Sequence, residues 1–544
     1  MKFKGIMTLC LAGFAISANA QTHVEGAEYY KADQFDNAKE LLLRSLNNSG
    51  TDTAVSDYYL GMIALREKKN SEAQKYFEQG MQANPEYGYN YIGAGTLALL
   101  NGNQKEAEQF FKEGESKGKK DPSLQIAIAR AYDMADPTAY QKQIAKRVEK
   151  AYKQDMKNPD YYIFEGDLAS EKKDWGDAGA KYEMATSYDP EASYAYVKYA
   201  NLFTMVNPPY AIDMLKKLLE VNPNSALGQR ELANAYYNAK DYKNAANEYG
   251  KYVQNPSHFK QDENRYAFLL FYGGDYQKGY DYATQLLQQD PANFTAQRYQ
   301  FMNAAQLESM KDRLLPMAEA LYTAHKANPA ANKFAAIDFT LIADELSKAK
   351  RADEAVAVLE EGIKEMPDNA AFSKDLAMKY VDQNNITKAA EAFRDYVKKI
   401  EEPGYNDYNQ QATFSFYAAV ENKDNPAKAK EFFDEVLANA DKMASILPDN
   451  YKPKMLQGDV AKQTAANEDE AAFAAQPKYE EAVALLEKSP DPSRYARDAK
   501  TLYMYLGNYY IKKDDVAKAK EYFNKFLALD PDNEAVRKYV DSLK

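Results

Sequence analysis

Cysteine is almost absent from this chain, since Cys10 is the only one in 544 residues. A disulfide within the chain and a zinc site built on several thiolates are therefore both excluded. Cys10 lies in an apolar N-terminal stretch, and Leu9 precedes it where the lipid-attachment motif of bacterial lipoproteins needs Gly, Ala or Ser. We interpret Cys10 as an apolar residue of that stretch.

Histidine is nearly as scarce, and the motifs of common catalytic sites are missing. None of His23, His258 and His325 has a second histidine or a cysteine at metal-ligand spacing. The sequence contains no G-x-S-x-G elbow and no Walker loop. Carboxylates are abundant but alternate with lysines, as in residues 518–521, which is typical of solvated helix surfaces. The sequence therefore predicts no catalytic residues, no metal site, no cofactor and no enzymatic activity.

An excess of positive charge and long apolar runs are also lacking. Asp and Glu outnumber Lys and Arg by 81 to 69, and the formal net charge is −12. An acidic chain repels the phosphates of nucleic acids, so we predict no nucleic-acid partner. Beyond the N-terminus, no apolar run approaches the roughly 20 residues of a transmembrane helix, and we expect no membrane span.

Residues 1–20 form a separate unit. A basic start, an apolar run over 6–16 and the small-x-small end Ala18-Asn19-Ala20 follow one another. This order is typical of a secretory signal peptide, cleaved here after Ala20. We therefore expect the mature chain to be periplasmic or secreted.

The chain does contain a regular series of prolines, spaced by 31 to 45 residues. The series is Pro85, Pro122, Pro159, Pro190, Pro223, Pro256, Pro291, Pro329, Pro367, Pro403, Pro448, Pro490 and Pro531. Most of them follow Asn or Asp, a pairing that ends one helix and begins the next, because proline cannot continue a helix and Asx side chains cap one. Self-similarity at this period indicates a repeat protein.

A second pattern recurs between these prolines. In residues 506–531, the small residues Gly507 and Ala519 are combined with the aromatic residues Tyr510 and Phe523. Small residues allow two helices to approach closely, and the aromatic rings fill the space between them. Stretches that repeat this order include 166–190 and 231–256.

This pattern resembles the tetratricopeptide repeat, a helix–turn–helix unit of about 34 residues with small, aromatic and proline residues at the same positions. The resemblance implies an all-α solenoid superhelix of about fourteen repeats, and it favours a secreted or periplasmic protein of a Gram-negative bacterium. We predict about eleven repeats over 21–403. Degenerate repeats, one strong repeat and a capping helix at 534–543 would then occupy 404–544.

A short glycine motif at 93–98 (GAGTLA) also fits the G-x-G-x-x-[GA] pattern of dinucleotide-binding turns. That turn needs a strand before it and a helix that opens at the glycines, whereas an Asn-Pro break precedes this motif. Gly95 occupies the small position of the repeat, like Gly507. We therefore interpret Gly95 as a helix-packing residue, and we expect it to tolerate alanine.

The resemblance also suggests a binding groove, because the first helix of each tetratricopeptide unit lines a concave surface. Two central repeats carry unusual residues there, each set on one helix face, and a third repeat begins with an arginine. These candidates are Arg230, Asn234, Tyr237 and Asn238, then Asn264, Phe268, Phe271 and Tyr272, then Arg298.

This candidate set is similar to the carboxylate clamp with which some tetratricopeptide domains hold C-terminal tails. Arg230 stands where lysine is usual, and Asn264 and Arg298 lie about one position early. We expect the residues to face solvent and to bind a protein or peptide partner with an anionic tail. The alternative is that they are ordinary variable residues of the groove.

The repeat architecture favours a non-enzymatic scaffold of the cell envelope that binds protein or peptide partners in its concave groove. The alternative is an outer-membrane-associated nutrient or glycan capture protein, since some receptors of that class are built on tetratricopeptide helices. Those receptors carry a lipid-attachment cysteine and a large irregular insertion, and this sequence has neither. The scaffold is therefore the favoured hypothesis.

Overall fold

The computed structural model describes residues 22–48, 50–118, 121–489 and 492–543. The predicted signal peptide and its cleavage site lie outside these residues. The described residues form helices and short 3-10 segments without any strand, which confirms the all-α prediction. The chain divides into two compact units, Met1–Gln306 and Leu307–Lys544.

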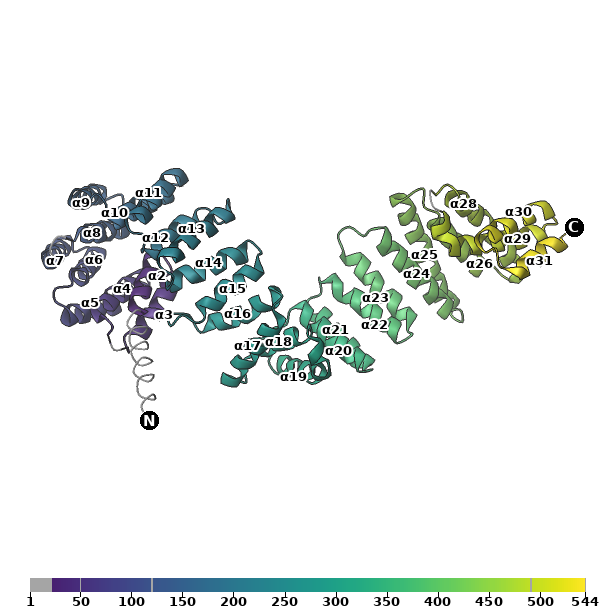
Figure 1. Cartoon of the computed structure of the whole chain (residues 1–544), viewed down its shortest axis with the longest axis horizontal. Helices are drawn as coiled ribbons and strands as arrows, with labels where there is room; N and C mark the ends of the chain where they lie inside the picture. Colours follow the sequence, from purple (N-terminus) through teal and green to yellow (C-terminus); the bar gives the residue numbers. More distant parts are fainter. Residues whose placement is uncertain (1–21, 49, 119–120, 490–491, 544) are drawn as a thin grey trace, which may run out of the picture. The chain divides into compact units, whose positions relative to one another are not determined.

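The first unit contains helices α2 to α18 (Figure 1). Their bounds are α2 Thr22–Lys31, α3 Phe35–Ser45, α4 Thr53–Arg66, α5 Asn70–Ala83, α6 Gly88–Leu100, α7 Gln104–Lys117, α8 Pro122–Ala135, α9 Gln141–Gln154, α10 Pro159–Glu171, α11 Trp175–Tyr188, α12 Ser193–Asn201, α13 Pro208–Val221, α14 Ala226–Asn238, α15 Tyr242–Tyr252, α16 Gln261–Tyr272, α17 Tyr276–Gln289 and α18 Phe294–Ala304.

The second unit begins with a 3-10 segment, η1, and ends with α31. Its elements are η1 Glu308–Arg313, α19 Leu314–Ala327, α20 Ala336–Lys348, α21 Ala352–Glu365, α22 Ala370–Asp382, α23 Ile386–Lys399, α24 Tyr405–Glu421, α25 Pro426–Ile446, α26 Lys452–Gln463, α27 Glu468–Ala474, α28 Gln476–Leu486, η2 Pro492–Tyr495, α29 Ala496–Lys512, α30 Val516–Leu529 and α31 Glu534–Ser542.

By their order along the chain, the described helices form fourteen successive pairs, from α2–α3 to α29–α30, with the short α27 inserted between α26 and α28. This number agrees with the predicted repeats, and α31 lies where the capping helix was expected. The boundary between the two compact units follows Gln306, and η1 lies between α18 and α19 in the sequence. The change of repeat quality proposed at 403/404 concerns how closely the repeats follow the consensus, and it stays a prediction.

Asx residues and prolines begin several helices, as the sequence predicted. The Asn158 side chain accepts a hydrogen bond from the Tyr161 N–H, and Pro159 is the first residue of α10. Asp121 and Pro122 have the same roles at the start of α8. At other boundaries the proline lies in the turn between two helices, before the residue that caps the second helix.

In several pairs, an aromatic ring of the second helix presses on a glycine of the first. A Cβ atom on Gly95 would lie 2.6 Å from a ring carbon of Phe111 and 3.1 Å from the carbonyl oxygen of Ala107. The expectation that Gly95 tolerates alanine is therefore wrong. Equivalent contacts join Gly61 to Phe77, Gly166 to Tyr182 and Gly507 to Phe523. Helix α6 runs straight through residues 93–98, so these glycines form no dinucleotide-binding turn.

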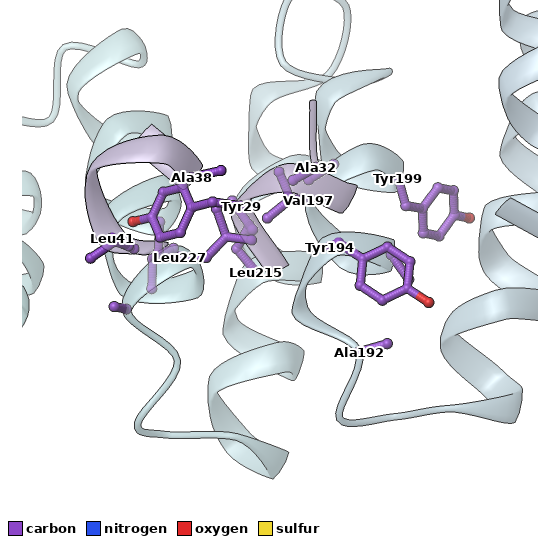
Figure 2. Packing of buried hydrophobic residues seen from close by; sticks show 14 of the residues in the cluster. Tyr29, Ala32, Ala38, Leu41, Ala192, Tyr194, Val197, Tyr199, Leu215 and Leu227 are labelled. Atoms are coloured by element: carbon purple, nitrogen blue, oxygen red, sulfur yellow. The ribbon is translucent and has the colours of Figure 1, made fainter. Parts of the chain in front are cut away.

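The first unit closes on itself, because α2 packs against α12 and α14 as well as against α3 and α4. A single hydrophobic core joins residues of α2 to α5 with residues of α10 to α16. Tyr29 of α2 is fully buried in this core, and its ring centroid lies 5.3 Å from that of Phe259. Figure 2 shows Tyr29 beside Leu41 and Leu227. The closure brings together segments 166 residues apart in the sequence.

Two half-buried carboxyl groups of α2 fix this closure at the N-termini of the opposite helices. Glu28 accepts a hydrogen bond of 3.0 Å from the Tyr194 N–H of α12, and Glu25 accepts one of 3.3 Å from the Leu227 N–H of α14. Carboxylates are favourable at helix N-termini, where N–H groups lack partners. Burial nevertheless raises the pKa of Glu28 to about 7, and burial together with the charge of Glu28 raises that of Glu25 to about 7.

We predict that Gly95→Ala lowers the free energy of unfolding by about 1–3 kcal/mol, because the added methyl group overpacks against Phe111 and the backbone of Ala107. The matched control is Gly176→Ala in α11, where a Cβ atom would meet only a carboxylate oxygen at 3.8 Å. The control should be neutral or stabilising, since alanine favours the helix. Thermal and urea unfolding followed by circular dichroism measure both, and equal stability of Gly95→Ala and the parent would contradict the assigned packing.

The raised pKa values of Glu25 and Glu28 predict that closure weakens as the pH rises. Both groups keep a proton up to about pH 7 in the folded chain, against an ordinary pKa of 4.5. The folded state therefore binds more protons than the unfolded state between these values, and the free energy of unfolding falls as the pH rises through this window. We expect a higher melting temperature at pH 5 than at pH 7.5 from this contribution.

The variant Glu25→Gln/Glu28→Gln isolates the contribution, because glutamine does not titrate. Its melting temperature should change less between pH 5 and pH 7.5 than that of the parent. The control Asp177→Asn/Glu183→Gln removes two exposed acids of α11 and should keep the parent's pH dependence. Identical pH profiles in all three proteins would refute the role given to the two glutamates.

Candidate functional site

A cavity of about 500 Å³ lies inside the first unit, between α2, α4, α8, α10 and α12. Its floor is made of buried residues, among them Ile126, Ile163 and Phe164. Asp33 and Arg66 at its rim are exposed, so the cavity is open to solvent. The closure of the unit creates this space, because α2 contributes residues to one of its walls.

Tyrosine rings form an apolar wall of the cavity. The ring of Tyr59 lies 5.0 Å from that of Tyr30 and 4.9 Å from that of Tyr58, whose other neighbour is Tyr89 at 5.3 Å. Burial raises the pKa of Tyr58 and Tyr59 well above the ordinary value of 10, so both stay neutral. Aromatic faces carry partial negative charge and attract cations.

An ion-pair network crosses the same cavity, with Asp167 at its centre. The Asp167 carboxylate lies 2.8 Å from Arg130 and 2.9 Å from Lys198, and it accepts a hydrogen bond of 2.9 Å from the Tyr182 hydroxyl. Burial alone would favour the protonated acid, but the charges of Arg130 and Lys198 hold the pKa of Asp167 below its ordinary value. Lys198 also pairs with Asp33, in the turn that follows α2. This network is therefore internally neutralised and ties α2 to the wall.

Asp160 is neutralised in the same way. It lies 3.6 Å from Lys31 of α2 and accepts a hydrogen bond of 2.7 Å from the Tyr194 hydroxyl. Its pKa stays below the ordinary value in spite of burial, because Lys31 favours the ionised form. Lys31 is thus already paired with an acid of the cavity wall.

Two further acids of the cavity are not neutralised. Among the described residues, neither Asp133 nor Glu171 forms an ion pair, although both line the cavity. Burial raises the pKa of Asp133, and burial and the charge of Asp133 raise that of Glu171. Arg66 also lines the cavity and stacks on Phe35 at 4.2 Å, and its charge partly offsets that of Asp133. With five acids and four cations in its lining, the cavity keeps an excess of one negative charge next to a tyrosine wall.

The structure places the predicted groove residues elsewhere in the first unit. Arg230 does not face solvent as expected, because its Nε donates to Asp262 Oδ2 at 2.7 Å and its guanidinium lies over the Phe259 ring. Only 15% of the Arg230 side chain and 7% of the Asp262 side chain are exposed. We expected the Arg230 guanidinium to bind the carboxylate of a tail, but it is already paired with the Asp262 carboxylate of this chain.

The other candidates form an aromatic group with polar neighbours. The ring of Phe268 lies 6.0 Å from that of Tyr237 and 4.6 Å from that of Tyr272, and Phe271 is buried beside Tyr272. The polar residues lie around this group. Asn264 accepts from Asn293, Asn234 lies near Glu231, Asn238 is exposed, and Arg298 donates to the Tyr299 hydroxyl. The structure thus brings the aromatic candidates together, and binding of a tail at this surface stays a prediction.

Sequence reasoning missed the cavity, because its residues are separated by up to 168 positions, from Tyr30 to Lys198. One signal was available: Lys198 interrupts the apolar α12 segment SYAYVKYAN, and a lysine at a buried position needs a paired acid. The identity of that acid depends on how the superhelix closes. No helix in the described part of the chain is long and apolar enough to span a membrane.

Models of the tetratricopeptide repeat family match three segments of the chain, residues 207–258, 346–403 and 501–533. None of the curated proteins matches the sequence. These matched segments fall in both compact units.

Similar solved structures include the C-terminal part of a TPR repeat-containing protein from Cytophaga hutchinsonii, with 16% identity over 52% of this chain and 99% of that chain, and a TM-score of 0.40. Another is the human IFIT1 dimer with PPP-AAAA, with 14% identity over 84% and 94% and a TM-score of 0.32. A third is Pseudomonas aeruginosa pilF, with 20% identity over 40% and 97% and a TM-score of 0.28. At these scores the likenesses indicate nothing about function.

The family matches coincide with pairs of helices that carry the small, aromatic and Asx-Pro positions of the repeat. In the segment 501–533, for example, α29 and α30 pack with Gly507 against Phe523. The chain is a tetratricopeptide-repeat protein.

Proposed function

We propose that the protein is a non-enzymatic scaffold of the cell envelope that binds a partner protein inside its first unit. Tetratricopeptide repeats are characteristic of protein-interaction scaffolds. The observation that carries the proposal is the cavity of the first unit, where Asp133 and Glu171 lack an ion-pair partner beside a wall of tyrosines. Its volume lies in the range of about 300–1,000 Å³ that is typical of binding pockets.

The chemistry of the cavity favours a cationic side chain of the partner. A lysine or arginine would neutralise the two free acids, whose ionised forms are disfavoured by burial. Its charge would also lie close to the faces of the tyrosine rings, which attract cations. The chain's own cations Arg130, Lys31 and Lys198 are each held by an aspartate, which leaves Arg66 as the cation of the lining that competes for Asp133.

The proposed location is the periplasm or the cell exterior, and its support is the sequence of residues 1–20. The acidic net charge of −12 supports the absence of a nucleic-acid partner. Together these features favour a protein partner within the envelope of a Gram-negative bacterium.

An anionic tail bound at Arg230 remains a second proposal for the partner. Asn234 supports it, because its Nδ2 makes only a long contact of 3.5 Å with Glu231 and keeps an N–H to donate to a carboxylate. The ion pair between Arg230 and Asp262 opposes it, since a tail would have to displace a carboxylate that is already in place. The cavity, whose acids are free, needs no such exchange.

A glycan or nutrient is the alternative ligand, and the same cavity would take it. Tyrosine rings and fixed carboxylates are the kind of apolar and polar groups that orient a small ligand in a pocket. A neutral sugar would not neutralise Asp133 and Glu171, whereas a cationic side chain would. This difference separates the two candidates in one experiment.

The probes are N-acetyl-arginine amide, N-acetyl-glutamine amide, N-acetyl-glutamate amide and a set of neutral monosaccharides, titrated by calorimetry or by NMR. We expect the arginine probe to bind most tightly. Asp133→Asn/Glu171→Gln should weaken it at least about tenfold, because one charged hydrogen bond contributes roughly 1.5–3 kcal/mol. The control Asp177→Asn/Glu183→Gln makes the same charge change on the exposed face of α11 and should bind like the parent.

Equal binding of the arginine and glutamine probes would contradict the cationic partner. Tight binding of a monosaccharide that survives Asp133→Asn/Glu171→Gln would favour the glycan alternative. Tighter binding of the glutamate probe than of the arginine probe would support the anionic tail at Arg230.

Arg230→Ala should lower the free energy of unfolding by about 2–4 kcal/mol, because it leaves the buried Asp262 without its partner. Asn238→Ala, at the exposed asparagine of the same candidate set, should cost less. Chemical unfolding of the two variants measures the difference. A fully stable Arg230→Ala protein would show that the ion pair with Asp262 is dispensable and would restore Arg230 as a candidate for tail binding.

A further inference from the structure

A histidine and two glutamates converge in the second unit, apart from any residue used above. His325 lies in the last turn of α19 and is fully buried, and Glu361 and Glu365 are one helical turn apart on α21. One ligand atom from each of the three lies within 4.8 Å of the others. Residues four apart on a helix share a face, so both carboxylates can reach the same point.

The surroundings of His325 fix its ring and aim one nitrogen at a carboxylate. Nδ1 lies 2.8 Å from the carbonyl oxygen of Asn332, and a carbonyl can only accept, so Nδ1 donates to it. Nε2 lies 2.9 Å from a Glu365 carboxylate oxygen. A contact this short between a ring nitrogen and a carboxylate needs a cation between them, which is either a proton on Nε2 or a metal ion.

The ring cannot turn away from this contact. Phe334 stacks on the imidazole at 4.0 Å, with an interplanar angle of 10°, and Phe339 meets it edge-on at 5.5 Å. A ring packed in this way keeps Nε2 aimed at the carboxylates. Metal-bound histidines are commonly held by a carbonyl on the other nitrogen, as His325 is held by Asn332.

The helix ends add to the attraction for a cation. Glu365 is the last residue of α21, and His325 is in the last turn of α19. The C-terminal end of a helix carries partial negative charge, which disfavours a carboxylate there and favours a positive charge. The negative ends of both helices and the Glu365 carboxylate of α21 therefore lie around the same small volume.

We propose that His325 Nε2 and carboxylate oxygens of Glu361 and Glu365 bind a divalent transition-metal ion of the Zn²⁺ class. Imidazole suits zinc and its neighbours better than it suits Mg²⁺ or Ca²⁺. Bonds of about 2.0–2.1 Å in a tetrahedral site place ligand atoms about 3.3 Å apart, and the present separations of 2.9 Å to 4.8 Å need only small side-chain adjustments.

Three protein ligands leave a fourth position for water or for a side chain of a partner. The Tyr322 hydroxyl donates to Glu361 Oε2, which orients this carboxylate and leaves its other oxygen for the metal. The metal would link the second helices of two successive pairs, α19 and α21, and would stabilise the second unit by mass action.

His258 in the first unit provides a contrast. Its Nδ1 lies 2.7 Å from the Asn255 carbonyl oxygen and its Nε2 lies 3.2 Å from Glu263, so its ring is held in a similar way. It is partly exposed, and no other carboxylate joins it in a cluster of three ligands among the described residues. His258 is therefore the matched control for His325.

The experiment measures Zn²⁺ and Co²⁺ binding to the full chain after removal of metal with a chelator, by calorimetry and by Co²⁺ absorption. We expect one tight Zn²⁺ ion in the parent and in His258→Gln. Glu365→Gln should weaken the affinity more than about a hundredfold, since loss of an outer partner alone costs about 10- to 100-fold. Its side-chain amide can donate to Nε2, so Glu365→Gln should fold without metal at least as well as the parent.

His325→Gln should also lose the ion and the rise of the melting temperature that Zn²⁺ produces. Because His325 is buried and this variant can fail to fold, Glu365→Gln decides. Unchanged zinc affinity in Glu365→Gln would overturn the proposal. So would a parent that binds no zinc and whose His325 is an imidazolium at pH 7.5 in ¹⁵N NMR spectra, since a proton would then be the cation between Nε2 and Glu365.

Discussion

The packing of α2 against α12 and α14 is the contact on which the candidate site of the first unit depends. Two glutamates of α2 lie half-buried in this contact, where loss of water disfavours their ionised forms unless hydrogen bonds offset it. Here the N-termini of two helices supply the donors to Glu25 and Glu28. Because Lys31 of the same helix and Asp33 of the turn after it form ion pairs at the cavity, the closing contact and the candidate site form one structure.

This dependence explains why the cavity holds so many charges. In a repeat array stabilised only by apolar contacts between neighbouring pairs of helices, no interaction would hold two distant pairs in a fixed position. Ion pairs such as Lys198 with Asp167 are weak as sources of stability when buried, but they discriminate strongly between correct and incorrect partners. They set the register in which α2 meets the array, and they leave Arg66 as the cation of the cavity lining that no acid holds in an ion pair among the described residues.

The sequence predicted the repeat architecture well, because consensus positions are local. Gly507, Ala519 and Phe523 lie within one pair of helices, and their order alone indicates how that pair packs. The finer steric question was harder: a small residue at position 95 was correctly inferred, but whether alanine fits depends on how close the Phe111 ring comes. Distances of a few tenths of an ångström are not encoded in a pattern of residue types.

The candidate sites could be predicted only in part, since their contacts are not local. Arg230 has the residue type of a tail-binding arginine, but nothing in the sequence shows that Asp262, 32 residues later, neutralises it. The cavity needs the superhelix to close before Asp133 and Tyr30 face the same space. The ligand set of His325 was missed because glutamates 36 and 40 residues away are indistinguishable, in sequence, from the many acids of solvated helix faces.

Both proposals follow from one physical criterion applied to each unit by itself. In a folded protein, buried or half-buried polar groups normally have partners, and a group that has none indicates either a cost to stability or a missing ligand. Half-buried Asp133 and exposed Glu171 at the rim form no ion pair among the described residues, and His325 Nε2 faces a carboxylate that needs a cation beside it, whereas Asp167 and Asp160 are satisfied within the chain. The repeat consensus specifies none of these residues, so they are the positions at which this array differs from a generic one. We therefore expect ligands to bind where the packing of the array leaves polar groups without a full set of partners, and in both units these groups are carboxylates.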